Sequence, residues 1–350
     1  FPVFVLYISI AKHHFVITDS RSSASISIIV VAKNEESTIA ACLNALMAQT
    51  YQCDHFEVLV IDDASTDRTG EILTKFANSR CVRVLQKISS SNYKSSKKGA
   101  LECAAAEAGG DIILFTDADC TPGPEWAKSM VSCFDEFTGL VAGFSPQVTK
   151  KKLLNSLLAI DAAAAAFVAS GTIGLGRGVT CAGRNLAVRK QALLDIGGYA
   201  ALPDSLSGDD DFVLQKISAH PKWNVRYAFG ADTVVPAVGP NSMGGFIKQK
   251  QRHISAGRYF SFFAQSAFAL FFAANFVLWI GFIVAPFYNL LWMLPFLAKL
   301  LLDYFVLFTF SSRFDKRFAA PAFLIWEPLY LYYNVIVGPL AFFKKIKWKA

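Results

Sequence analysis

Residues 111–120 read DIILFTDADC, in which an apolar run ends abruptly in two carboxylates one residue apart. A continuous apolar run of this kind is typical of a strand that is covered on both faces of a sheet. In an extended segment, residues two apart project from the same face, so Asp117 and Asp119 are expected to point together, with Ala118 facing away. Two carboxylates form a hard, oxygen-only donor set that suits Mn²⁺ or Mg²⁺. A solvated turn after a strand would have the same sequence, so this stretch alone does not decide between the two.

Strand and helix patterns alternate through the chain on either side of this stretch. Single helical patterns separate strands with buried character, which predicts a mostly parallel sheet with helices on both faces. Strands are expected at residues 25–35, 56–65, 81–87 and 110–119, and helices at 36–50, 66–77 and 97–108. In such sheets ligands bind beyond the carboxyl ends of the strands. Residues 32–36, 62–65 and 117–119 are therefore expected to meet at one edge.

Several classes of protein are disfavoured by composition. No GxGxxG or GxxxxGK[ST] motif follows the first strand, which argues against a dinucleotide fold and a phosphate loop. The 7 cysteines are scattered, with no CxxC pair, which argues against a zinc site and a disulfide framework and favours a reducing compartment. The net charge of +7 comes without a recognition helix, so it favours a membrane surface or phosphorylated ligands over nucleic acid.

Beyond about residue 260 the chain becomes almost entirely apolar. Residues 264–286 carry no charge over a spanning length, which predicts a transmembrane helix. Residues 288–310 are nearly as apolar, and their Lys299 and Asp303 have the i,i+4 spacing of an ion pair on one helix face. Residues 321–343 contain Glu327 and Pro328, and this block either spans or dips in and returns. Basic clusters flank all three blocks, and the positive-inside rule accommodates two spans better than three.

Four segments, taken together, resemble a known family. SIIVVAKNEESTIAACLNALMAQTY, FEVLVIDDASTDRTGEI, KKGAL and DIILFTDADC follow one another across about residues 25–125. In order and spacing they resemble the nucleotide-sugar half of family 2 glycosyltransferases, which have the GT-A fold. The resemblance implies an α/β fold with a mixed, mostly parallel sheet flanked by helices. An interfacial helix and C-terminal transmembrane helices are expected to follow.

The resemblance also assigns residues to the donor site. It implies that Ala32 and Glu36 line the nucleotide pocket, that Asp63 holds the base, and that Lys98 lies near the base or the diphosphate. It further implies that Asp119 is the direct ligand of Mn²⁺ or Mg²⁺, with Asp117 alongside on the ribose or the metal. Gly183, Arg184 and Asn185 resemble the segment beside the donor sugar. The glycine-rich residues 171–178 before them are equally compatible with a flexible loop that leads into a helix.

Three adjacent aspartates, Asp209, Asp210 and Asp211, precede an apolar helical run. They repel one another unless a cation is near, so at least one is expected to have a raised pKa. Asp211 is assigned to the helix N-terminus, where a carboxylate is favourable. Residues 208–210 resemble the GED or TED motif of the family, whose last residue is the general base. That assigns the base to Asp210, or to Asp211 if the register slips by one.

Residues 249–253, QKQRH, resemble the QxxRW motif of the family, with His253 in place of Trp. The resemblance implies an interfacial helix under the active site, on which Gln249, Arg252 and His253 contact the substrates. The alternative for the basic residues of this region is contact with lipid headgroups. That alternative concerns Lys248, Lys250 and Arg258.

The predicted organisation has four parts. Residues 1–20 are interpreted as the remnant of an N-terminal membrane anchor, with a buried strand as the alternative. Residues 25–240 are predicted to form the catalytic domain, 241–262 an interfacial amphipathic segment, and 263–345 a region with two to three transmembrane helices. The protein is expected in the inner or plasma membrane, with its catalytic domain in the cytoplasm and membrane lipids around its helices.

The predicted activity is inverting transfer of a sugar from a UDP-sugar to a hydroxyl of a lipid-linked or membrane-proximal glycan acceptor. Asp210 would remove the proton, and departing UDP would be stabilised by the metal and by Arg252 or Lys98. The sugar and the oligomeric state stay open. A processive polysaccharide synthase is the alternative, although two or three helices would form only a thin channel. From other classes, the sequence favours less a metal-dependent nucleotidyltransferase, a non-catalytic nucleotide-sugar binding module and a transporter.

Overall fold

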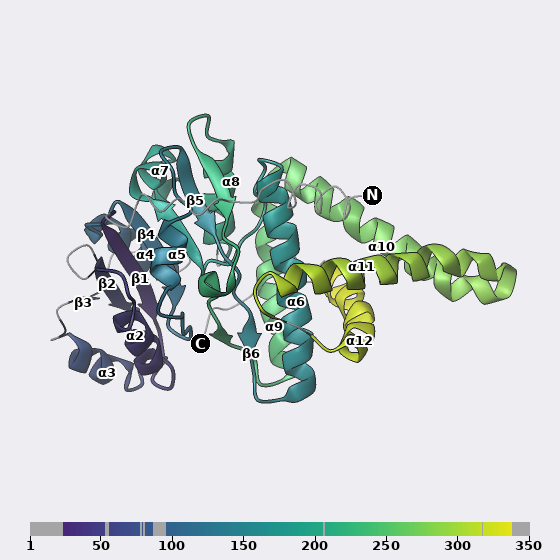
Figure 1. The fold of residues 1–350 in the computed structure, drawn as a ribbon, viewed down its shortest axis with the longest axis horizontal. Coiled ribbons are helices and arrows are strands. Elements are labelled where there is room, and N and C mark those ends of the chain that lie inside the picture. The colour runs from purple at the N-terminus through teal and green to yellow at the C-terminus, as the bar shows by residue number, and fades with distance from the viewer. Residues whose placement is uncertain are drawn as a thin grey trace.

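The chain folds around one mixed sheet of seven strands (Figure 1). The computed structural model describes residues 24–52, 56–77, 79, 81–86, 96–205, 207–316 and 318–337. Within them the strand order is β3-β2-β1-β4-β7-β5-β8. The strands are β1 (Ile26–Ala32), β2 (Phe56–Asp62), β3 (Val82–Gln86), β4 (Ile112–Asp117), β5 (Thr138–Ala142), β7 (Leu186–Arg189) and β8 (Asn224–Tyr227). Strands β1 to β4 are mutually parallel and β7 is antiparallel to both of its neighbours, which confirms the predicted mixed, mostly parallel sheet.

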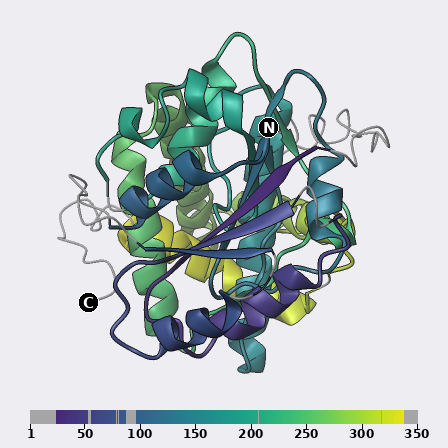
Figure 2. The same cartoon turned by 90° about the vertical axis from the view of Figure 1, so that its left-hand side faces the viewer.

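Helices cover both faces of the sheet because alternate residues of each strand point into different cores. Ile28 of β1 packs with helices α2 (Ile39–Met47) and α5 (Trp126–Val131) on one face. Ile29, the next residue, packs with α4 (Ser96–Glu107) and α6 (Lys152–Gly174) on the other. Viewed along the long axis, the strands fan out and helices lie on both sides of them (Figure 2). This double burial is the physical reason for the continuous apolar runs in the sequence.

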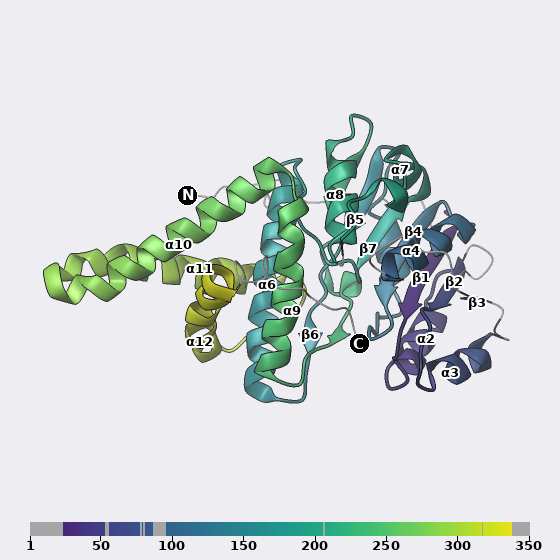
Figure 3. The same ribbon diagram turned by 180° about the vertical axis from the view of Figure 1, so that it is seen from behind.

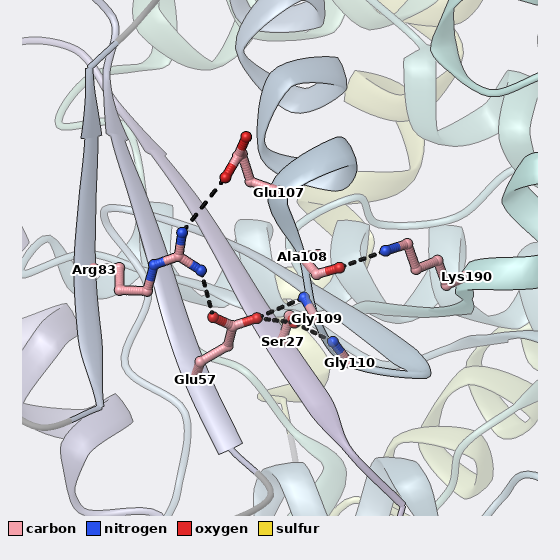
Figure 4. A network of polar contacts seen from close by, with 8 residues as sticks. All are labelled: Ser27, Glu57, Arg83, Glu107, Ala108, Gly109, Gly110 and Lys190. Atoms are coloured by element: carbon pink, nitrogen blue, oxygen red, sulfur yellow. Dashed lines mark hydrogen bonds and ion pairs between the residues drawn. The ribbon is translucent and has the colours of Figure 1, made fainter.

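Polar groups tie together the amino ends of the strands, at the edge opposite the predicted site (Figure 4). Glu57 accepts hydrogen bonds from the Ser27 hydroxyl at 2.6 Å and the Gly109 N–H at 2.7 Å, and it pairs with Arg83 at 3.1 Å. The Gly110 N–H donates to the Ser27 hydroxyl. A Cβ at Gly110 would lie 2.5 Å from the backbone of β1, so only glycine fits there. These contacts fix the turn before β4 against β1 and β2.

The remaining elements form a layer beside the sheet and an arm that projects from it (Figures 1 and 3). Helices α6 (Lys152–Gly174) and α9 (Met243–Ala256) run side by side in the layer. Both begin just after the short parallel strands β6 (Gln147–Val148) and β9 (Ala237–Val238). The other segments are α3 (Thr69–Phe76), α7 (Lys190–Asp195), α8 (Asp209–Ala219), α10 (Phe262–Tyr288), α11 (Leu294–Ser312), α12 (Ala320–Leu331), the short 3₁₀ helices η3 (Tyr199–Ala201), η4 (Ala231–Thr233), η5 (Gly257–Tyr259) and η6 (Leu290–Met293), and the π-helix η7 (Tyr332–Val337).

Three of the described helices are long and apolar enough to cross a membrane by length and composition. They are Lys152–Gly174, Phe262–Tyr288 and Leu290–Ser312. The last two coincide with the predicted spans. In their apolar 18-residue stretches only 6% and 17% is buried inside the protein, whereas 61% of the corresponding stretch of Lys152–Gly174 is buried. Helix α6 packs between the sheet and helices α11 and α12, so its apolar character serves the protein core.

The predicted ion pair in the second apolar block is confirmed. The Lys299 ammonium lies 2.9 Å from the Asp303 carboxylate one turn away. It also contacts the carboxylate of Glu327, which α12 supplies from the third block. Residues 320–337 of that block form α12 and η7, and whether the block spans or re-enters stays a prediction. The predicted anchor remnant at residues 1–20 lies outside the described residues.

One described cysteine is cross-linked. Cys81, just before β3, is disulfide-bonded. The sequence argues against a disulfide framework, which is a set of several such bonds, so a single bond does not overturn that expectation. The other described cysteines, Cys42, Cys103, Cys120, Cys133 and Cys181, are free thiols.

Candidate active site

A cavity of about 990 Å³ opens at the carboxyl end of β4 and continues along α6 and α9 to α10. Its polar end gathers side chains from the first turn of α4, from the end of β4 and the turn after it, from the loop before β7, from the first turn of α8 and from α9. These are Lys97, Asp117, Asp119, Gly183, Arg184, Asp209, Asp210, Asp211, Gln249, Arg252 and His253. The structure therefore brings together most of the residues that the sequence singled out, from segments far apart in the chain, and adds Lys97.

Asp117 ends β4, and Asp119 lies in the turn that follows. The Cys120 N–H donates to the Asp117 carbonyl at 3.1 Å, so the chain turns between the two carboxylates, whereas an extended segment was expected. Both carboxylates still line the cavity, and Ala118 is buried in the core as expected. Burial, followed by the charge of Asp117, raises the pKa of Asp119 to about 6. Such crowding of like charges is what a bound divalent cation relieves, so this oxygen-only pair fits Mn²⁺ or Mg²⁺.

Lys97 lines the site, and the predicted Lys98 does not. The Lys97 ammonium lies 2.6 Å from the Asp117 carboxylate. Burial alone would raise the pKa of Asp117, but this cation holds it below its usual range. Lys98 is fully buried and donates to the carbonyls of Leu202 and Pro203. Lys98 was expected near the base or the diphosphate, but Lys97 is the lysine of this pair that lines the cavity.

A matched pair of variants tests this correction. Lys97→Met is expected to lower kcat by about 10²-fold, the usual loss when one preorganised donor is removed from an active site. Lys98→Met should instead cost about 1–3 kcal/mol of unfolding free energy, because two buried carbonyls lose their donor. The measurements are steady-state turnover and thermal unfolding of both variants. A well-folded Lys98→Met protein without activity, beside an active Lys97→Met protein, would restore the original assignment.

The segment at residues 183–185 closes one wall of the cavity, although its three residues play different parts. A Cβ at Gly183 would lie 2.7 Å from the Asp210 carboxylate, so glycine is needed for that close approach. Arg184 donates to the Ser145 hydroxyl at 2.7 Å, and its charge lowers the pKa of Asp117 and Asp119. Asn185 is fully buried and bonds only within the protein, including an acceptor bond from the Trp126 indole N–H at 2.9 Å.

Two expectations for this region are corrected. Asn185 was predicted to bind substrate, but it serves to hold the loops of this wall together, since the carbonyls of Phe144 and Thr233 accept from its amide. Residues 171–174 were grouped with a glycine-rich loop, but they form the last turn of α6. The loop that follows leads into strand β7, whereas a helix was expected.

The three aspartates occupy the first turn of α8, and two of them accept from different backbone N–H groups. The Asp210 carboxylate accepts from the Gly183 N–H at 2.7 Å, and Asp211 accepts from the Cys181 N–H at 2.9 Å. Burial, followed by the charge of Asp210, raises the pKa of Asp209 to about 7 and that of Asp211 well above its usual range. Burial also raises the pKa of Asp210, while nearby Lys97 opposes the rise. The expected raised pKa is therefore present.

Helix α9 presents Gln249, Arg252 and His253 to the cavity. Enclosure by the cavity walls, followed by the charges of Arg252 and Lys250, lowers the pKa of His253 well below its usual range, so the ring is neutral. The alternative from the sequence places Lys250 against lipid headgroups, but its side chain points to α6. It pairs with Asp161 of α6 and lies beside an aromatic ring of α9 and one of η7.

The loops after β1 and β2 lock onto each other at the same edge of the sheet. Glu36 accepts from the Arg68 backbone and side chain, so it holds the two loops together and does not line the cavity. Within this loop, the charge of Glu35 also raises the pKa of Asp119. Ala32 has its side chain in the core, and its carbonyl accepts from the N–H of buried Asp63. Neither Ala32 nor Asp63 is part of the described cavity wall.

These features define a sugar-transfer enzyme of the GT-A type. The chain matches the sequence profile described as Glycosyl transferase family 2 over residues 27–186, and the one described as Glycosyl transferase family group 2 over residues 112–333. Since the second match spans more than half of the 350 residues, the chain belongs to this family of glycosyltransferases.

Individual relatives show the same relationship. The chain is 31% identical over 182 residues to the probable glycosyltransferase YdaM of Bacillus subtilis (strain 168), a match that covers 50% of this chain and 42% of YdaM. It is 36% identical over 94 residues to the UDP-Glc:alpha-D-GlcNAc-diphosphoundecaprenol beta-1,3-glucosyltransferase WfaP of Escherichia coli, covering 27% of this chain and 35% of WfaP. Both matches thus span less than half of the relative's length.

Among solved structures, the chain is similar to the mannosyltransferase PcManGT from Pyrobaculum calidifontis in complex with GDP-Man and Mn²⁺. The TM-score is 0.55 at 17% identity, and the match covers 97% of this chain and 79% of the other. At this identity the similarity shows the fold, and it includes the region beyond the sheet.

Proposed function

We propose that this protein transfers a sugar from a UDP-sugar to a hydroxyl of a lipid-linked acceptor, with inversion at the anomeric carbon. The observation that carries the proposal is the shape of the cavity. From the carboxylates at the end of β4 it continues between the small residues Ala162, Ala165 and Ala169 of α6 and the rings of α10. An acceptor with a polar head and an apolar tail matches such a cavity. The name of WfaP describes a lipid-linked acceptor and a UDP-glucose donor for that relative.

Asp210 is the proposed general base. It lines the cavity, and the Gly183 N–H at 2.7 Å orients its carboxylate without adding a cation to it. A proton leaving the acceptor hydroxyl would pass to this carboxylate as the hydroxyl oxygen attacks the anomeric carbon. Lys97, Arg184 and Arg252 line the same cavity and supply positive charge that would stabilise a departing diphosphate.

Single displacement explains inversion, and it requires that no side chain attack first. Cys181 lines the cavity, but burial, followed by the charges of Asp210 and Asp211, raises the pKa of its thiol well above the usual range. A thiol is a poor nucleophile until it is deprotonated. The acceptor oxygen is therefore the proposed nucleophile.

Asp119 is the proposed ligand for Mn²⁺ or Mg²⁺, with Asp117 beside it. The carboxylate-only donor set and the mutual repulsion of the pair support this choice. A divalent ion bound here would act as a Lewis acid toward the diphosphate oxygens. The catalytic domain is proposed to lie on the cytoplasmic side of the membrane, as the basic clusters near the helices suggest.

The test is release of UDP by the detergent-purified protein over a panel of UDP-sugars, with Mn²⁺, Mg²⁺ or EDTA and with polyprenyl-phosphate and diacylglycerol acceptors. One donor should give release that depends on both metal and acceptor, with one sugar added per acceptor. Long products would favour a processive synthase, and release of diphosphate would favour a nucleotidyltransferase. Tight UDP binding without turnover on any acceptor would favour a binding module.

A further inference from the structure

The starts of α6 and α9, with the strands β6 and β9 that precede them, form an unusual surface at the end of the α6–α9 layer. Four large apolar side chains are exposed there, and three consecutive lysines accompany them. The surface, called here the basic tip, consists of Val148, Lys150, Lys151, Lys152, Leu153, Val238 and Met243. Leu153 is 55% exposed and Met243 is 39% exposed. Exposed apolar groups that are rimmed by charge mark an interaction surface.

The charges of the basic tip have no counter-charge in the part of the chain that the structure describes. Among the described residues, none of Lys150, Lys151 and Lys152 forms an ion pair, and no acidic residue lies in the first turn of α6. Three cations at a helix N-terminus repel each other and the helix dipole. An external anionic surface would relieve this repulsion.

The shape between the two helices suits an apolar insertion. A hollow of about 280 Å³ lies between the starts of α6 and α9, lined by Lys151, Leu153, Leu154, Leu157, Ser242 and Met243. Apart from the lysine and the serine, its wall is aliphatic or thioether. A lysine beside an apolar hollow matches a phospholipid, whose phosphate is anionic and whose chain is apolar.

The position of the basic tip relative to the membrane helices decides the partner. Helices α10 and α11 leave the layer in one direction, and α6 and α9 run across that direction (Figures 1 and 3). When α10 and α11 cross a bilayer, α6 and α9 therefore lie along its surface. Helix α12 packs on α6, so the tip lies at the end of a layer that already adjoins the apolar arm.

We infer that the basic tip is a second membrane contact, which docks on anionic phospholipid headgroups and inserts Leu153 and Met243 among them. The three lysines pair with lipid phosphates while the apolar side chains reach the acyl boundary. This contact is additional to the anchoring by α10 and α11. It would hold the α6–α9 layer flat on the membrane. The inference concerns membrane docking and does not depend on the sugar or the acceptor.

Photo-crosslinking of the full chain in nanodiscs tests the inference. Leu153→p-benzoylphenylalanine places the probe in the basic tip. Leu194→p-benzoylphenylalanine is the matched control, because Leu194 is 58% exposed and lies on α7, at the far side of the sheet domain (Figure 1). The probe at position 153 should crosslink to phospholipid, severalfold more in phosphatidylcholine–phosphatidylglycerol discs than in phosphatidylcholine discs. The probe at position 194 should give background in both.

A charge-reversed variant completes the test. Lys150→Glu, Lys151→Glu and Lys152→Glu together should reduce crosslinking from position 153 to the level in neutral discs. Acidic residues are favourable at a helix N-terminus, so the variant should fold. Crosslinking at position 153 no higher than at position 194 would overturn the inference. Equal crosslinking in both lipid compositions, unchanged by charge reversal, would overturn its electrostatic part and leave only an apolar contact.

Discussion

Asp210→Asn is expected to lower kcat for sugar transfer by about 10²- to 10⁴-fold, the usual contribution of a positioned general base. Asparagine has the shape of aspartate and keeps an oxygen that can accept the 2.7 Å hydrogen bond from the Gly183 N–H. The wall of the cavity should therefore stay in place while the proton acceptor is lost. The measurement is steady-state UDP release with donor and acceptor saturating, beside calorimetry of UDP binding, which should be unchanged.

Asp211→Asn is the matched control, because Asp211 makes the same kind of bond to the backbone, accepting from the Cys181 N–H at 2.9 Å. It should keep most of the wild-type kcat. The reverse outcome, an inactive Asp211→Asn protein beside an active Asp210→Asn protein, would move the base by one position. Equal losses in both variants would point to the integrity of the α8 turn and away from either carboxylate as the base.

The pH profile gives an independent check on the same residue. A general base must be ionised, and burial raises the pKa of Asp210 although Lys97 opposes it. The kcat/KM value should therefore fall as pH falls through this raised pKa, and stay high above it. Lys97→Met removes the charge that favours the ionised carboxylate, so it should shift the acidic limb of the profile to higher pH. An unchanged limb in that variant would mean that another group titrates.

The sheet could be predicted from the sequence because burial on both faces leaves a direct pattern. Strands β1, β2 and β4 send alternate residues into different cores, so each reads as a continuous apolar run that ends in polar residues. Helix α6 could not be predicted from such a pattern. It contains a run of alanines and ends in glycines, and its burial between the sheet and the arm follows from tertiary packing that a single segment does not show.

The sequence predicts the site less completely than the sheet. Which of two adjacent side chains points into the cavity depends on a small rotation of the helix or turn that carries them. Lys97 and Lys98 both stand one turn before Leu101, which packs α4 on the sheet. The Lys98 side chain turns to the carbonyls of Leu202 and Pro203, whereas Lys97, four and seven residues before Leu101 and Ala104, reaches the cavity. Glu35 and Glu36 are another adjacent pair of this kind. They follow a turn with left-handed backbone at Asn34, and the sequence does not show which of the two carboxylates lies near Asp119.

Asp119→Asn is expected to abolish the metal dependence of UDP release and to lower kcat by about 10²- to 10³-fold, in line with the several kcal/mol that a metal contributes to leaving-group stabilisation. The physical reason is the crowding of carboxylates. Burial and the charge of Asp117 raise the pKa of Asp119 to about 6, and neutralising one member of the pair removes both the repulsion and the anionic oxygen that a cation requires.

Calorimetry separates this loss from misfolding. The wild-type protein should bind UDP more tightly with Mn²⁺ than with EDTA, whereas Asp119→Asn should bind UDP equally in both. Glu36→Gln is the control at the same edge of the sheet, because the Glu36 carboxylate is already engaged by Arg68, and it should keep the metal effect. If Asp119→Asn retains the metal effect and Asp117→Asn loses it, the cation is held by Asp117. The ion pair from Lys97 to Asp117 argues against that outcome, because a carboxylate paired with an ammonium at 2.6 Å is the weaker candidate for a second cation.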